Sequence, residues 1–132
     1  MNMKLELVAV PVSDVDKAKT FYENIFGPAD MDAEVNPDLR FIQFTPPGSA
    51  CSICIGKNIA GNMKPGSVEG LQLVVENINE ARSYLESKGL SVGDVDVQEW
   101  GKFVYFTDPD GNGWAVQELP DYTANPNLVK TG

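Results

Sequence analysis

The sequence predicts an α+β fold made of two tandem βαβββ modules, and three observations support that prediction. A helix-like segment at residues 14–22 recurs at residues 77–85. The turn at residues 45–49 recurs at residues 108–112, at the same offset of 63 residues. Strand-like and helix-like segments also follow one another in the same order in both halves. Two copies are too few for a solenoid, so the halves are expected to share one sheet or barrel and to build a site between them.

The first module is predicted over residues 4–56. Residues 4–10 alternate between apolar and polar side chains, as a half-buried strand does. Asp14 is a good N-cap for a helix that runs to about Phe26, and Gly27 ends it. Three more strands are expected, a weak edge strand at residues 31–35 and clearer ones at residues 39–45 and 51–56.

A linker at residues 57–68 carries glycine and proline breakers and leads into the second module, predicted over residues 69–119. Asn77 and Glu80 resemble a capping box, and Gly89 ends the helix that they begin. Strands are expected on either side of this helix, at residues 71–75, 91–97, 103–107 and 114–119. A polar tail at residues 120–132 completes what we interpret as one domain.

Composition narrows the range of functions. The chain has 132 residues and a net charge of −9, which argues against nucleic acid as a partner and is compatible with a cationic ligand. No apolar run approaches the roughly 20 residues that a membrane helix needs. The first twelve residues alternate like a strand and lack the apolar segment of a signal peptide, so a cytoplasmic location and no membrane partner are expected.

The two cysteines form the string Cys51-x-x-Cys54, which in redox proteins stands at the start of a helix. Here the surrounding residues are typical of a β-strand. Side chains three residues apart on a strand point to opposite faces and lie too far apart for a disulfide. We therefore expect two buried free thiols.

Three segments together resemble the vicinal oxygen chelate superfamily, the group of glyoxalase I, bleomycin resistance proteins and extradiol dioxygenases. They are PVSDVDKAKTFYENIFG at residues 11–27, TPPGS at residues 45–49 and FTDPDGNGW at residues 106–114. The resemblance covers residues 4 to about 119. It implies that the two modules form a curled, half-open mixed β-barrel with the helices outside, and that the ligand lies in the trough between the modules.

Metal-dependent members of that superfamily place four ligands on the first and last strands of the two modules. The matching positions in this chain are Leu7, Ser52, Gly70 and Ala115, and none offers an imidazole, carboxylate or thiolate. The chain has no histidine at all. The resemblance is therefore to a metal-free, bleomycin-resistance-like branch, with no metal and no cofactor. Asp108, Asp110 and Asn112 look like part of a calcium loop, but the remaining ligands are missing and turn chemistry explains them.

Candidate ligand-binding residues follow from strand alternation. Ser52 and Cys54 are expected to face the trough from the first module, and Gln72 and Gln117 from the second. The Glu99-Trp100-Gly101 segment resembles the Trp-Gly segment of bleomycin resistance proteins, where an aromatic side chain stacks on the ligand. Further aromatic candidates are Phe44, Phe103 and Tyr105. Phe103 and Tyr105 are equally compatible with the core, and the two glutamines with bonding each other or water.

The preferred function is a homodimeric protein that binds a small organic molecule, aromatic or cationic and antibiotic-like, without a metal. The alternative is a metal-independent enzyme on the same scaffold, such as an isomerase, a lyase or a glyoxalase-like enzyme. Because there is no histidine, neither a Ser-His nor a Cys-His nucleophile is possible, and no catalytic residue is nominated.

Overall fold

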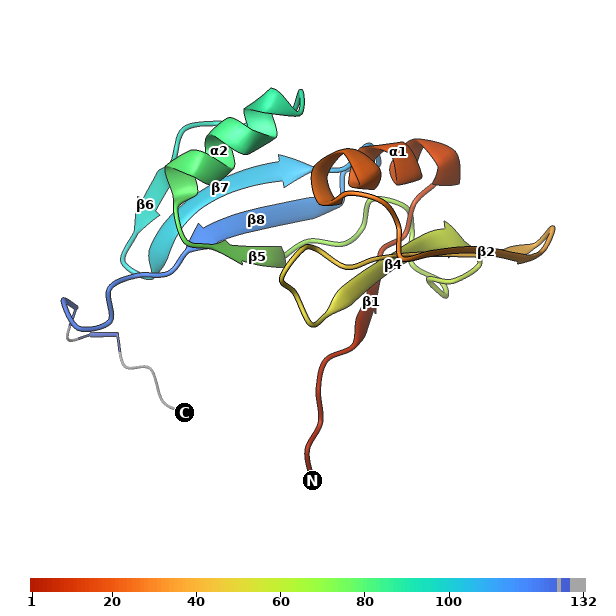
Figure 1. The fold of residues 1–132 in the computed structure, drawn as a ribbon, viewed down its shortest axis with the longest axis horizontal. Helices are drawn as coiled ribbons and strands as arrows, with labels where there is room; N and C mark the ends of the chain where they lie inside the picture. The colour runs from red at the N-terminus through yellow and green to blue at the C-terminus, as the bar shows by residue number, and fades with distance from the viewer. Residues whose placement is uncertain (126, 129–132) are drawn as a thin grey trace. The chain divides into compact units, whose positions relative to one another are not determined.

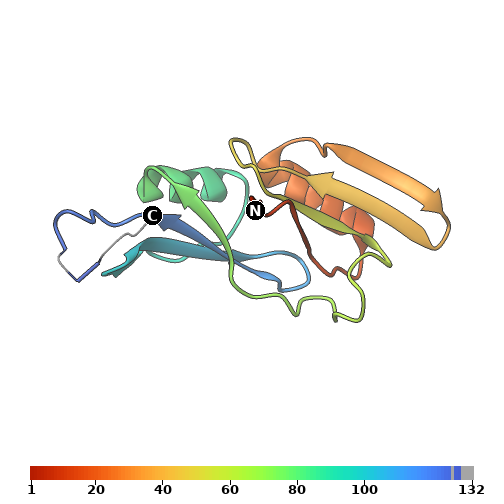
Figure 2. The same cartoon turned by 90° about the horizontal axis from the view of Figure 1, so that it is seen from below.

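The computed structural model describes residues 1–125 and 127–128, and the chain divides into two compact units. The first unit contains residues 1–69 and 107–112, and the second contains residues 70–106 and the described residues from 113 onward. Each unit carries one helix and its own sheet (Figures 1 and 2). The predicted tail lies partly outside the described residues, at positions 126 and 129–132.

The sheet of the first unit contains four strands in the order β1-β4-β3-β2. Strand β1 is parallel to β4, and the two remaining pairs are antiparallel. The elements are β1 (Leu7–Ala9), α1 (Val15–Phe26), β2 (Met31–Asn36), β3 (Leu39–Phe44) and β4 (Ser52–Lys57).

The second unit repeats this order of elements, with the strands arranged β5-β8-β7-β6. Its elements are β5 (Leu71–Val75), α2 (Ile78–Ser87), β6 (Asp96–Gln98), β7 (Gly101–Thr107) and β8 (Gly113–Glu118). The predicted pair of βαβββ modules is therefore confirmed. The described strands form two separate four-stranded sheets and no closed barrel.

Both helices begin where the sequence predicts. The Asp14 side chain accepts a hydrogen bond from the Lys17 N–H at 3.0 Å, and Asn77 accepts one from the Glu80 N–H at 3.0 Å. Each cap satisfies one of the N–H groups that the first helical turn leaves without a partner. No helix in the described part of the chain has the length and apolarity to cross a membrane.

Two strands are shorter than predicted. Strand β1 covers three residues rather than seven, because its only partner is β4, and the pairing begins where Leu7 meets Ser52. Strand β6 covers three residues and starts at Asp96, well after the predicted residue 91. Alternation alone does not tell where a neighbouring strand begins, and that neighbour determines where a strand can pair.

The core of the first unit lies between α1 and its sheet. Tyr22 of α1 contacts Phe44 of β3, with ring centroids 5.9 Å apart, and both side chains are fully buried. Ile42, Ile53 and Ile55 share the helix-facing side of the sheet with Phe44, because Ile42 pairs with Ile55 and Phe44 pairs with Ile53. The opposite face therefore belongs to the alternate residues of the same strands.

In the second unit, Trp114 stacks on Phe106 at 5.8 Å between ring centroids, and both are buried. Glu118 has the same strand parity as Trp114, and its Oε1 atom accepts a hydrogen bond from the Ile78 N–H at the start of α2. This contact identifies the helix-facing side of the second sheet, which α2 covers in Figure 1.

The loop between β7 and β8 packs within the first unit and is stabilised by a closed hydrogen-bond network. Asp108 Oδ1 accepts from the N–H groups of Asp110 and Asn112, while Oδ2 accepts from the Tyr22 hydroxyl at 2.8 Å and from Asn112 Nδ2. Asn112 Nδ2 also donates to the Pro11 carbonyl. The Asp108 carboxylate thus accepts four hydrogen bonds, which supports turn chemistry rather than a calcium loop.

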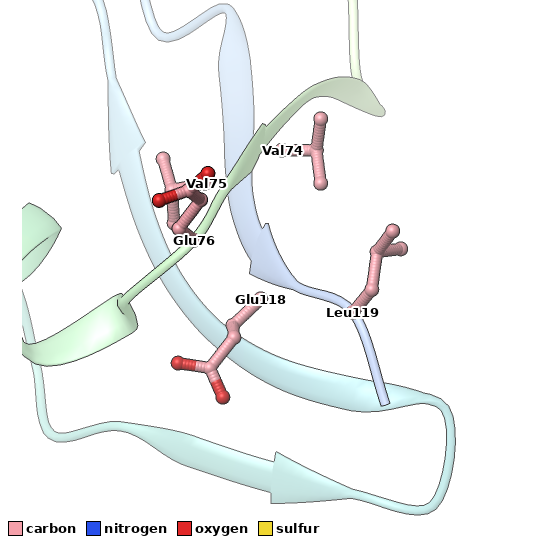
Figure 3. A pocket seen from close by; sticks show the side chains of 5 residues that line it. All are labelled: Val74, Val75, Glu76, Glu118 and Leu119. Atoms are coloured by element: carbon pink, nitrogen blue, oxygen red, sulfur yellow. The ribbon is translucent and has the colours of Figure 1, made fainter. Parts of the chain in front are cut away.

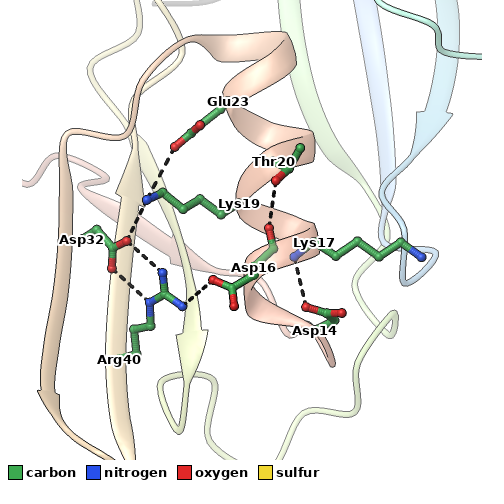
Figure 4. Close-up of polar contacts among 8 residues, drawn as sticks. All are labelled: Asp14, Asp16, Lys17, Lys19, Thr20, Glu23, Asp32 and Arg40. Atoms are coloured by element: carbon green, nitrogen blue, oxygen red, sulfur yellow. Dashed lines mark hydrogen bonds and ion pairs between the residues drawn. The ribbon is translucent and has the colours of Figure 1, made fainter.

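An ion-pair cluster joins α1 to β2 and β3 (Figure 4). Arg40 donates from Nε and Nη2 to the two carboxylate oxygens of Asp32, and Lys19 reaches Asp32 Oδ2 at 2.8 Å. Arg40 also contacts Asp16 at 2.8 Å. The hydrogen bonds from Arg40 and Lys19 hold the pKa of Asp32 well below its usual range.

Both cysteines are free thiols. Cys54 is buried within β4, and burial raises the pKa of its thiol. Cys51 is half-buried and precedes β4, so the expectation of two buried thiols holds for Cys54 alone.

Candidate functional site

The candidate site is the face of the second sheet that is turned away from α2, which we call the open face. Strand pairing sets its members, because Gln72 pairs with Ala115 and Val74 pairs with Gln117, all with parity opposite to Trp114. Phe103 and Tyr105 of β7 share this parity, since the alternate residue Phe106 stacks on Trp114. Val74 is 62% exposed and Tyr105 is 51% exposed.

Two amide side chains on the open face bond each other and a turn. Gln72 Nε2 donates to Gln117 Oε1 at 2.5 Å, and Gln117 Nε2 donates to the Trp100 carbonyl at 2.8 Å. Trp100 lies in the turn between β6 and β7, with 56% of its surface exposed. Because Gln117 already bonds both groups, Gln72 is the more accessible amide for a ligand.

Gly101 holds this turn close to β8. Its φ is +143°, and a Cβ there would lie 2.6 Å from the Glu118 carbonyl oxygen and 3.0 Å from Gln117 Nε2. Any other residue would push the turn away from the strand. The glycine thus allows the Trp100 carbonyl to reach Gln117.

Two aromatic rings complete the open face. Phe103 and Tyr105 are stacked, with centroids 6.1 Å apart and planes 3° apart. The Tyr105 hydroxyl donates to Asp96 Oδ2 at 2.9 Å, and partial burial together with this hydrogen bond raises the pKa of Tyr105. Phe103 is buried, so Tyr105 supplies the accessible part of the pair.

The equivalent face of the first sheet carries a chain of hydroxyl groups. Thr45 Oγ1 donates to Asp30 Oδ2 at 2.5 Å and lies 2.6 Å from Ser52 Oγ. Since the Thr45 proton goes to the carboxylate, the Ser52 hydroxyl must donate to Thr45. Gln43 Nε2 then donates to Ser52 Oγ at 3.3 Å. Ser52 is only 4% exposed, so its hydroxyl already has its partners.

The structure brings together one group of the predicted ligand residues and separates others from it. Gln72, Gln117 and Trp100 are connected by hydrogen bonds, and Phe103 and Tyr105 stack on the same face. Ser52 and Cys54 do face away from α1, but both are buried. Phe44 is fully buried against Tyr22 in the helix-facing core.

The expectation that placed Phe44 beside a ligand is at odds with its position, because Phe44 has the strand parity of Ile42 and packs under α1. Phe41, three residues away, has the opposite parity. Two open-face residues were missed, Val74 and Asp96. The alternation that selected Gln72 also indicates Val74, and Asp96 is found only once its pairing with Phe103 is known.

The four corners that hold metal in related proteins contain no suitable donors here. Leu7 pairs with Ser52, whose hydroxyl is bonded to Thr45 and Gln43. In the second sheet Gln72, rather than Gly70, pairs with Ala115 as Leu7 pairs with Ser52, so the first strands are related by 65 residues and not by 63. One bonded hydroxyl and one bonded amide do not fit a divalent transition metal.

Comparison with known proteins gives consistent results. The family model of the Glyoxalase/Bleomycin resistance protein/Dioxygenase superfamily matches residues 4–116. The uncharacterized protein YetH of Bacillus subtilis (strain 168) is 28% identical over 123 residues, covering 89% of this chain and 100% of YetH.

Two solved structures from Streptomyces sp. CB03234 are also similar. TnmS3, described as an antibiotic binding protein, is 30% identical with a TM-score of 0.79, and the match covers 89% of this chain and 97% of TnmS3. A glyoxalase/bleomycin resistance protein is 31% identical with a TM-score of 0.73, and the match covers 86% of this chain and 99% of that one.

Proposed function

Because the chain belongs to the glyoxalase/bleomycin resistance protein/dioxygenase superfamily, we propose that it binds a small, antibiotic-like organic molecule on the open face of its second sheet. Binding needs no metal and is not followed by turnover. TnmS3, whose description is that of an antibiotic binding protein, supports this choice among the functions that the scaffold hosts.

One observation carries the proposal. The open face combines exposed aromatic surface at Trp100 and Tyr105 with the hydrogen-bonding amide of Gln72. Aromatic rings offer stacking area at a small entropic cost, and a few amides fix the orientation of a ligand. The amide pair is already bonded to the Trp100 turn, so this surface is organised before a ligand arrives.

The composition of the corners supports binding without a metal. Leu7, Ser52, Gly70 and Ala115 supply no imidazole, carboxylate or thiolate. Glu118, the carboxylate next to Gln117, caps the start of α2 and so has a structural role.

Calorimetric titration with proflavine, a planar aromatic cation, and with bleomycin tests the proposal. Trp100→Ala is expected to weaken binding of at least one probe about five- to ten-fold, because a stacking partner is lost. Tyr84→Ala removes an equally exposed aromatic ring from α2 and serves as the matched control. Equal affinities in the two variants would remove Trp100 from the site.

Two further measurements separate this proposal from the enzyme alternative. Affinity is expected to survive dialysis against a chelator, and mass spectrometry is expected to recover the probe unchanged after prolonged incubation. Loss of binding on chelation would refute the metal-free proposal, and a converted product would favour the enzyme.

We also propose that the protein is a homodimer. Exposed apolar side chains line the N-terminal segment and the edge strand β2, namely Met1, Met3, Leu5, Met31 and Val35. Edge strands of this kind are usually covered in solution. Light scattering at micromolar concentration should give about twice the 14.4 kDa mass of one chain.

A further inference from the structure

An unassigned hollow of about 350 Å³ lies where strands β5 and β8 end, within the second unit. Its lining combines apolar and acidic side chains, Val74, Val75, Glu76, Glu118 and Leu119. In the view of Figure 3, Val74 and Leu119 lie on one side of the strand ends, and the carboxylates lie on the other. An occupant must therefore match an apolar wall and a negatively charged wall.

The apolar wall is unusually accessible. Val74 is 62% exposed and Leu119 is 43% exposed. Val74 pairs with Gln117, so the hollow adjoins the amide pair of the open face. A ligand that covers both valine and leucine side chains would remove apolar surface from water while resting beside Gln117.

The acidic wall lacks a balancing cation. Glu118 Oε1 accepts from the Ile78 N–H, and Lys102 approaches its Oε2 atom only to 3.7 Å. Among the described residues, the Glu76 carboxylate forms neither an ion pair nor a side-chain hydrogen bond. Glu76 is exposed and stays hydrated when the hollow is empty, so a cation can approach it without a large desolvation cost.

We propose that this hollow binds the alkylated ammonium group of an organic ligand. Methyl or methylene groups around the nitrogen would contact Val74 and Leu119, while the positive charge would face Glu76. A strongly hydrated ion such as Na⁺ has no use for the apolar wall, and a neutral hydrocarbon has none for the carboxylates. The inference rests on the proposed function and defines the charge of the molecule that the open face receives.

The test uses benzyltrimethylammonium and its uncharged isostere neopentylbenzene, which differ in one nitrogen in place of carbon. Titrations at low salt, followed by the amide signals of Val75, Glu76 and Leu119, report occupation of the hollow. The ammonium probe should shift these signals and bind about five-fold more tightly than the isostere. Glu76→Gln should remove most of that difference.

Glu80→Gln is the matched control, because Glu80 is also exposed and changes the net charge equally but does not line the hollow. It should keep the preference for the ammonium probe. Equal affinities for the two probes, or equal losses in both variants, would overturn the inference. If proflavine binding then still depends on Trp100, the proposed function stands. If no probe depends on Trp100, the proposed function itself has failed.

Discussion

The two units share one order of elements and one order of strands, yet the faces turned away from their helices are chemically different. In the first sheet, Ser52 and Cys54 are buried and a chain of hydroxyl groups fills the centre. In the second sheet, Gln72, Val74 and Tyr105 remain exposed. Duplication therefore preserved the backbone while one copy kept a satisfied surface and the other an accessible one. The following predictions test this difference, beginning with the largest effect.

Phe44→Ala should lower the free energy of unfolding by about 4 kcal/mol, because it opens a cavity under α1. Phe41→Ala, on the opposite face of β3, should cost clearly less, since Phe41 is only half-buried. Urea denaturation measures both. Phe44→Leu should fold and retain its affinity for proflavine. A Phe44→Leu variant with normal stability but no binding would return Phe44 to the ligand site.

Asp32→Asn should lower the free energy of unfolding by about 1 kcal/mol at pH 7, because Arg40 and Lys19 both lose a charged partner. Since folding depresses the pKa of Asp32, this stabilisation is fully present above about pH 4, the unfolded-state value, and is lost as the pH falls through the lower folded-state pKa. Unfolding measured from pH 7 to pH 2 should show the wild type and variant converging. A constant difference would contradict the assignment.

The second unit has no equally buried carboxylate at an ion pair of this kind among its described residues. Its Arg82–Glu86 pair is more exposed, with Glu86 at 48%. Glu86→Gln should therefore change stability by less than about 0.5 kcal/mol under the same conditions.

Ser52→Ala places in the first sheet the residue found at the paired position of the second, Ala115. It should cost about 1 kcal/mol of stability, because Thr45 and Gln43 lose a hydrogen-bond partner in a buried place. Proflavine affinity should not change. Ser49→Ala, at an exposed turn, is the control for loss of a hydroxyl group.

Gln72→Leu makes the reciprocal exchange, giving the second sheet the residue found at Leu7. Because Gln72 is exposed, stability should stay within about 0.5 kcal/mol of the wild type. Proflavine or bleomycin binding should weaken a few-fold, since Gln117 loses the donor that orders it. A large stability loss here, or a binding loss in Ser52→Ala, would reverse the roles given to the two sheets.

Much of the fold follows from local sequence signals. Asp14 and Asn77 fix the helix starts, and residues 71–75 form a strand with the predicted bounds. Strand alternation also placed Trp114 in the core and Gln72 with Gln117 on one face. The two-residue difference between the first strands escaped the repeat, because a change of register leaves strand parity intact when it is an even number of residues.

The site was less accessible to sequence reasoning. The hydrogen bond from Gln117 to the Trp100 carbonyl depends on a turn whose approach to β8 is set by Gly101. The hollow at Glu76 is formed where strands separated by more than forty residues end together, so no contiguous pattern indicates it. Phe44 shows the opposite limit, because an aromatic residue was assigned to a ligand before its strand parity had been compared with that of Ile42.

The loop at residues 107–112 has a consequence for the history of the duplication. Helix α1 has its only described tyrosine hydroxyl bonded to Asp108, and Pro11 offers its carbonyl to Asn112, two residues encoded in the other half of the gene. A chain cut at residue 69 would leave both polar groups stranded in an apolar interior. The two halves have thus become obligate companions, and an ancestral single copy must have met this need by pairing with another molecule or with different residues.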